Sequence, residues 1–144
     1  MITNEVQYRA TKTHLAHFET AIANLESRRE VDDRDRQRRE LEISALRSQA
    51  SDLEAEAEEY ELLQSGTLRR FEAGSLSELA NAMIKARIAK GWTQRRLAEE
   101  LGVAEQQIQR YEATSYASTS LARLGDVAAA LGAEVREVVT LAGL

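Results

Sequence analysis

The side chains best suited to catalysis or metal binding in this sequence are its two histidines, His14 and His17. Their three-residue spacing places both imidazoles on one face of a helix, where two ring nitrogens can hold a metal ion. No third ligand is evident, so the alternative is a pair of solvated surface residues. Cysteine is absent, which excludes thiolate nucleophiles, zinc-thiolate sites and disulfides. No carboxylate partner for the histidines and no glycine-rich phosphate loop is evident, so we expect neither an enzyme nor a cofactor.

The composition favours helices. The 144 residues include no proline and only 7 glycines, which is typical of long helices rather than sheets. No apolar run approaches the roughly 20 residues of a membrane-spanning helix. The polar start, Met1 to Glu5, does not resemble a signal peptide. We therefore expect an all-α, cytoplasmic protein without a membrane partner.

The net charge of −5 argues against nucleic acid as a partner, but it hides an asymmetry. Residues 1–64 hold 9 basic and 15 acidic side chains, a net of −6, whereas residues 65–144 hold 10 and 9, a net of +1. Within the second part, residues 85–110 hold 6 basic and 3 acidic side chains, a net of +3. Differently charged parts suggest modules with different partners. We predict a helical dimerisation or partner-binding arm over residues 1–64, a linker over 65–74 and a second domain over 75–144.

The arm carries two apolar stripes at the 3-and-4 spacing of a helix. The first consists of Tyr8, Leu15, Phe18, Ile22 and Leu25, and the second of Ile43, Leu46, Ala50, Leu53, Ala57 and Tyr60. Both stripes are narrow and have charged flanks, so each helix needs a partner helix to bury enough surface.

Two arrangements of the stripes are open. Residues 28–40 contain Val31 as their only apolar side chain, and Asp32 or Asp33 can cap a new helix. This pattern favours a turn and an antiparallel hairpin. Leu25 and Leu46, however, lie 21 residues apart, which is three whole heptads. A single long helix is therefore an alternative, although it would place charged residues at the seam, where they are costly. These are Arg29, Asp32, Arg36 and Arg39.

Residues 75–132 carry the start and stop signals of four short helices. Ser75 and Glu78 fit a capping box, and Gly91 can stop the helix that it starts. Thr93 can cap a helix over residues 94–101, and helices over 105–113 and 120–131 follow.

Gly102 marks the turn between the second and third of these helices. A tight turn demands positive φ there, which is costly for a residue with a β-carbon. Two short helices joined in this way have the spacing of a helix-turn-helix. Residues 67–72 can form a linker or a short strand, and residues 134–141 a strand or a final helix.

The pattern over residues 76–132 resembles the helix-turn-helix domain of Xre/Cro-type, lambda-repressor-like regulators. The matching positions are Trp92-Thr93-Gln94, Leu97-Ala98, Leu101-Gly102-Val103, Ile108 and Arg110-Tyr111-Glu112. The resemblance implies a five-helix domain, of which residues 120–131 form the fourth helix.

The resemblance also implies roles for individual residues. It assigns DNA contacts to Gln94, Arg95, Glu105, Gln106, Gln107, Arg110, Thr114 and Ser115. Gln94 would donate to a phosphate and brace a side chain of the recognition helix. At the start of that helix, Gln can bind adenine, Arg can bind guanine and Glu can accept from cytosine. Arg87 and Glu112 match an internal, structural ion pair of the family.

The sequence departs from the family at two positions. Ala104 stands where a capping Ser or Thr is usual, so the recognition helix starts weakly or relies on Glu105 near its dipole. The glycine that commonly follows Glu112 is missing. The loop over residues 113–119 can contact phosphate. It can equally be a solvated loop in which Ser118 or Thr119 caps the next helix.

The resemblance predicts a repressor. One such domain reads few base pairs, so we expect a homodimer on an inverted repeat of double-stranded DNA, with half-sites about one helical turn apart. The arm would hold the two copies together. One alternative is a HigA-like antitoxin that also binds a toxin through its arm. Two further alternatives are a helical core without a DNA partner and an arm that merely covers its own second domain.

Overall fold

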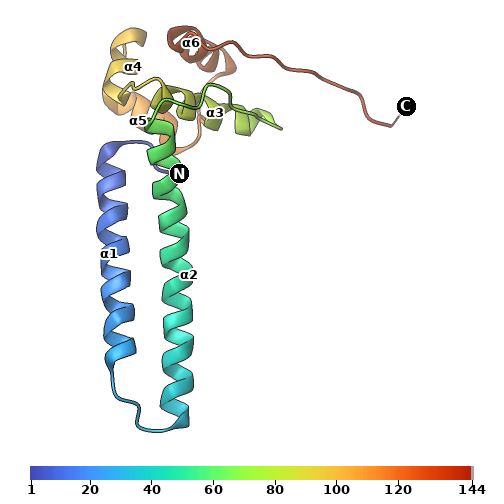
Figure 1. Ribbon diagram of the computed structural model, residues 1–144. Helices are drawn as coiled ribbons and strands as arrows, with labels where there is room; N and C mark the ends of the chain where they lie inside the picture. Colours follow the sequence, from blue (N-terminus) through green and yellow to red (C-terminus); the bar gives the residue numbers. More distant parts are fainter. Residues whose placement is uncertain (144) are drawn as a thin grey trace. The chain divides into compact units, whose positions relative to one another are not determined.

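The computed structural model describes residues 1–143, and all regular structure among them is helical (Figure 1). The six helices are α1 (Glu5–Ser27), α2 (Asp33–Gln64), α3 (Leu76–Ala89), α4 (Gln94–Leu101), α5 (Glu105–Ala113) and α6 (Leu121–Leu131). The chain divides into two compact units, Met1–Leu62 and the part from Leu63 onwards. The all-α prediction is confirmed. Within residues 1–143, no helix combines the length and apolar character needed to cross a membrane.

The first unit is a helical hairpin, and the single long helix is excluded. Helices α1 and α2 lie side by side and are joined by the short segment 28–32 (Figure 1). Asn4 caps α1 by accepting from the backbone N–H of Gln7 at 2.9 Å, and Asp32 caps α2 by accepting from Asp35 at 2.8 Å. The turn is shorter than the charged segment 28–40 from which it was predicted.

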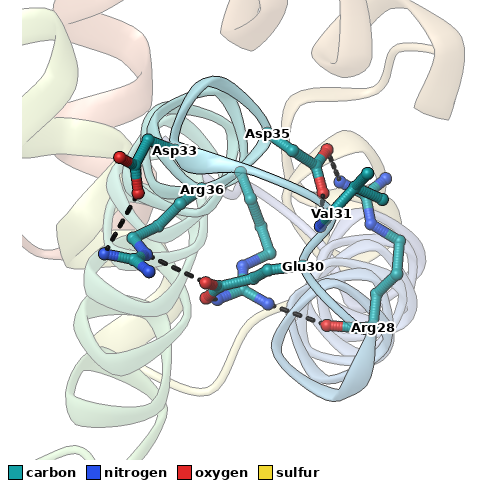
Figure 2. A network of polar contacts seen from close by, with 7 residues as sticks. Arg28, Glu30, Val31, Asp33, Asp35 and Arg36 are labelled. Carbon is teal, nitrogen blue, oxygen red and sulfur yellow. Dashed lines mark hydrogen bonds and ion pairs between the residues drawn. The ribbon is translucent and has the colours of Figure 1, made fainter.

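The charged residues of the turn pair with one another at the tip of the hairpin (Figure 2). Arg28 binds Asp35 at 3.0 Å, and Arg36 binds Glu30 at 2.9 Å. Arg39 also binds Glu30 and donates to the backbone carbonyl of Arg28 at 2.8 Å. In the turn, these charged side chains pair with one another. In a continuous helix, they would need opposite charges from a second chain.

The second unit contains α3 to α6 around one apolar core. Ser75 caps α3, as predicted, by accepting from the N–H of Glu78 at 3.2 Å. The Glu78 carboxylate, however, accepts from Gly74 rather than from Ser75 itself. Helix α4 packs against α5 and α6, and α3 packs against α6. The buried side chains of the core include Ile84, Ile88, Leu97, Ile108, Leu124 and Val127.

The fifth helix that the resemblance implies is not formed within the described residues. Gly132 ends α6 with a φ of 67°, and residues 133–143 have no regular structure. Val138 and Val139 are each 91% exposed, so no other residue among 1–143 covers the apolar side chains that would hold a helix in place. Residues 67–73 also form neither helix nor strand.

Candidate nucleic-acid interface

Helices α4 and α5 form the helix-turn-helix, and both have the boundaries that the sequence predicted. Thr93 caps α4 by accepting from the N–H of Arg96 at 3.0 Å. Gly102 ends α4 in the left-handed conformation, with a φ of 67°. Val103 then donates to the carbonyl of Ala98 at 3.0 Å, which closes the turn. Ala104 gives α5 no side-chain cap.

One face of α5 presents polar side chains to solvent. Glu105, Gln106 and Arg110 are exposed, and Gln107 is half-exposed. None of the four side chains makes a hydrogen bond or ion pair with another described residue, so their donors and acceptors are available to a ligand. Amide and guanidinium groups on a short exposed helix can bind the edges of bases.

Gln109 is a member of this face that the sequence analysis missed. It is exposed and lies one turn after Glu105 and Gln106, at the border of the face that carries the buried Ile108 and Glu112. The signal was present in the helical spacing of residues 105, 106 and 109. The family pattern drew attention to Gln107 and Arg110 instead.

A buried ion pair joins α5 to α3. The Arg87 and Glu112 side chains are only 3% and 1% exposed, and Nη2 of Arg87 lies 2.6 Å from Oε1 of Glu112. Arg87 Nε donates to the same carboxylate at 2.8 Å, and Nη1 donates to the carbonyl of Trp92 at 2.7 Å. Burial raises the pKa of Glu112, and the positive charge of Arg87 opposes that rise. The pair fixes the end of α5 relative to α3 and to the start of α4.

Gln94 supports the same carboxylate. Its side chain is buried, and Nε2 lies 3.4 Å from Oε2 of Glu112. The structure therefore places Gln94 against the C-terminal part of α5. Its direct contact with a DNA phosphate stays a prediction.

The arginines of α4 are exposed but have partners on their own helix. Arg95 pairs with Glu99 at 3.5 Å, and Arg96 pairs with Glu100 at 2.7 Å. Such exposed pairs contribute little to stability, so a phosphate can compete for either arginine.

The loop after α5 is held by an aromatic residue that the sequence analysis missed. Tyr116 is buried, its ring lies 5.6 Å from that of Tyr111, and its N–H donates to the carbonyl of Tyr111 at 2.7 Å. Burial raises the pKa of its hydroxyl. Ser115 and Tyr116 have φ values of 50° and 58°, a left-handed conformation that is costly for residues with a β-carbon. An aromatic residue within a polar loop was the available signal.

The hydroxyl groups of this loop have different roles from those expected. Thr114 Oγ1 bonds the carbonyl of Arg110 at 3.3 Å, so the hydroxyl already has a partner. The next helix, α6, is capped by Ser120, which accepts from Arg123 at 3.1 Å. Neither Ser118 nor Thr119 caps it, and Thr119 Oγ1 is buried without a partner among the described residues.

The two histidines lie apart from this face. His14 and His17 are exposed on α1. Among residues 1–143, no cluster of three or more His, Cys, Asp or Glu side chains could hold a metal ion.

Comparison with known protein families matches residues 83–138 to the family described as Helix-turn-helix. The match includes α4, α5 and α6 and the second half of α3, and it leaves α1 and α2 outside. Comparison with curated proteins and with solved structures found no match.

Proposed function

Because residues 83–138 form a helix-turn-helix domain of the Xre and lambda-repressor type, we propose that this DNA-binding regulator is a repressor that recognises an inverted repeat as a homodimer. The observation that carries the proposal is the set of side chains on α5 that have no partner within the chain. They are Glu105, Gln106, Gln107 and Arg110.

The proposed interface separates base recognition from backbone contacts. Gln106 and Arg110 suit bidentate bonds to adenine and guanine in the major groove. Arg95 of α4 and the side-chain hydroxyl of Ser115 suit phosphate oxygens. The Arg87–Glu112 pair and Gln94 hold α5 at a fixed orientation between these contacts.

The homodimer follows from the small footprint of a single domain. One recognition helix reads a few base pairs, and useful specificity requires two copies on a two-fold axis. We assign dimerisation to the arm, because its narrow apolar seam needs further helices to cover it.

The test is a selection of bound sequences from random DNA, followed by binding measurements on the enriched site. An inverted repeat is expected. Gln106→Ala and Arg110→Ala should each weaken binding by about 1–3 kcal/mol and relax preference at one position of each half-site. Gln49→Ala on α2 and Arg123→Ala on α6 serve as controls of the same residue types. Enrichment of no sequence would contradict the proposal.

An antitoxin is the second candidate. The last part of α2 is strongly acidic, with Glu54, Glu56, Glu58, Glu59 and Glu61 within ten residues. Such a surface suits a basic toxin, and the same protein would repress its own operon as HigA-like antitoxins do. Co-expression with the product of a small adjacent reading frame tests this function. A stable complex and relief of growth arrest would support it.

A further inference from the structure

A groove of about 940 Å³ runs along one side of α3. Its floor is a stripe of α3 residues at alternating spacings of three and four, which share one face of the helix. Leu76 is 66% exposed, Leu79 is half-buried and Met83 is buried. The volume is typical of ligand sites, which range from about 300 to 1,000 Å³. The stripe consists of Leu76, Leu79, Met83, Ala86 and Lys90.

Two segments without helix or strand line this floor, residues 68–73 and residues 134–139. We call them the border segments. Neither makes a backbone–backbone hydrogen bond with another residue among 1–143, so their N–H and C=O groups can pair with an added strand. The second border segment leaves α6 in an extended line (Figure 1). Free backbone groups beside an apolar floor are the arrangement that binds extended peptides by strand addition.

The border segments also carry large apolar side chains that no residue among 1–143 covers fully. Leu68 is 37% exposed, and Val138 and Val139 are each 91% exposed. Every second side chain of an extended peptide points to the same face, so a peptide on the floor of the groove can present apolar side chains to α3 at regular intervals. Burial of these apolar surfaces is the main favourable contribution to such a contact.

The charged side chains that line the groove are four basic and two acidic ones, a net of +2 in a chain whose net charge is −5. They are Arg69, Arg70, Lys90, Arg136, Glu134 and Glu137. Glu134 already binds Arg136 at 2.7 Å. Arg69 makes no ion pair or hydrogen bond with another residue among 1–143, and Arg70 lies 3.9 Å from Glu72 in a highly exposed pair. The surplus positive charge therefore lies on residues 68–73, where it favours a peptide that carries carboxylates.

The groove has the length of a short strand and lies apart from the recognition helix. From Leu76 to Lys90, α3 rises by about 21 Å at 1.5 Å per residue, which is the length of about six extended residues. No residue of α4 or α5 is among those that line the groove. A bound peptide therefore leaves the polar face of α5 uncovered.

We infer that the groove binds an extended acidic segment of a partner protein, which adds a strand along the border segments and places alternate apolar side chains on α3. Because α5 stays uncovered, the protein can hold this partner and DNA at the same time. The inference goes beyond the proposed repressor, and it requires neither the homodimer nor an inverted repeat.

A synthetic peptide tests the inference on the full-length protein. A fluorescein-labelled octapeptide that alternates valine and glutamate should bind saturably in fluorescence anisotropy. Replacement of its glutamates by lysine, or of its valines by serine, should weaken binding about tenfold, because the first change reverses the charge and the second removes the apolar contacts.

Methylation of the peptide backbone tests the added strand itself. Alternate N–H groups of a strand point to opposite sides, so N-methylation at the valines or at the glutamates removes the donors of one side only. One of the two methylated peptides should lose binding about tenfold. Unchanged binding of both would overturn strand addition.

Two pairs of variants locate the peptide. Leu76→Glu should weaken binding about tenfold, because it puts a carboxylate on the floor of the groove. Leu121→Glu is its matched control, since both leucines follow a capping serine at a helix start and are 66% and 70% exposed. Arg69→Glu should weaken binding of the glutamate peptide and strengthen binding of the lysine peptide, whereas Arg9→Glu in the arm should change neither. Circular dichroism checks that each variant is folded.

The remaining outcomes are also decisive. Absence of peptide binding, binding of dodecanoate in its place, or equal losses in Leu76→Glu and Leu121→Glu would overturn the peptide site. Addition of the DNA enriched by selection should leave the peptide Kd unchanged, and a tenfold rise would overturn simultaneous binding. Failure of the peptide to bind leaves the DNA selection unaffected, and failure to enrich an inverted repeat leaves the peptide result standing.

Discussion

The two units of this protein use charged residues in opposite ways. In the DNA-binding domain, Arg87 and Glu112 are buried and surrounded by polar partners. In the arm, the Arg47–Glu26 pair is exposed by 63% and 48%. A buried pair fixes geometry, because breaking it leaves an unmatched charge away from water, whereas an exposed pair is replaced by solvent at little cost. Buried contacts within the chain therefore fix the geometry of the domain, whereas the exposed charges of the arm are accessible to a partner.

The largest expected difference between the two units comes from removing one arginine of each. Arg87→Ala should lower the free energy of unfolding by about 3–5 kcal/mol, because Glu112 would remain buried without its partner. Arg47→Ala should lower it by at most about 1 kcal/mol. Urea unfolding of both variants measures the contrast. Equal losses would show that burial does not distinguish the two pairs.

Separation of the units should affect binding more than folding. A chain of residues 63–144, the second compact unit, should remain helical and become monomeric, because it keeps the buried Leu63 together with the core of α3 to α6. Its affinity for the operator should fall by about a hundredfold or more when linkage of two half-sites is lost. Light scattering and mobility shifts measure these effects. A truncated protein that is still a dimer would refute the assignment of dimerisation to the arm.

The turn between α4 and α5 offers a matched pair of glycines. A β-carbon at Gly102 would contact nothing within 4 Å, so the cost of Gly102→Ala comes from its φ of 67° alone and should be about 1–2 kcal/mol. Gly125 lies inside α6 with equally open surroundings, and Gly125→Ala should stabilise by about 0.5–1 kcal/mol. Thermal unfolding measures the sign of the stability change in both variants. A Gly102→Ala variant that is more stable than wild type would contradict the left-handed turn.

The smallest effect concerns pH. Burial raises the pKa of Glu112 above its ordinary value of 4.5, so the folded state binds this proton more tightly than the unfolded state does. The resulting stabilisation is complete below pH 4.5 and is lost as the pH rises through the folded pKa. Glu112→Gln should remove this dependence. Urea unfolding from pH 4 to 7 measures the difference in free energy of unfolding between wild type and variant. This difference should be constant below pH 4.5 and change only above it.

Local signals predicted much of the fold. Both ends of α4 were predictable from Thr93 and Gly102, because a helix cap and a left-handed stop depend only on neighbouring residues. Ala104 was recognised as a poor cap for the same reason. The hairpin was predicted from the charged residues around Val31, because such residues are costly at a helix–helix seam unless opposite charges face them.

Features that depend on distant contacts were not predictable in this way. The position of Tyr116 depends on its stacking with Tyr111, and no periodicity reveals such a loop anchor. Gln94 was expected to reach DNA, and only the folded core shows how closely it lies against Glu112. The segment around Val138 has apolar residues suited to a helix or a strand, but whether it forms one depends on a surface that covers it.

Helix α2 is longer than its neighbour in the hairpin. It has 32 residues and α1 has 23, a difference of nine residues or about 14 Å at a rise of 1.5 Å per residue. Part of α2 therefore has no helix of its own hairpin beside it.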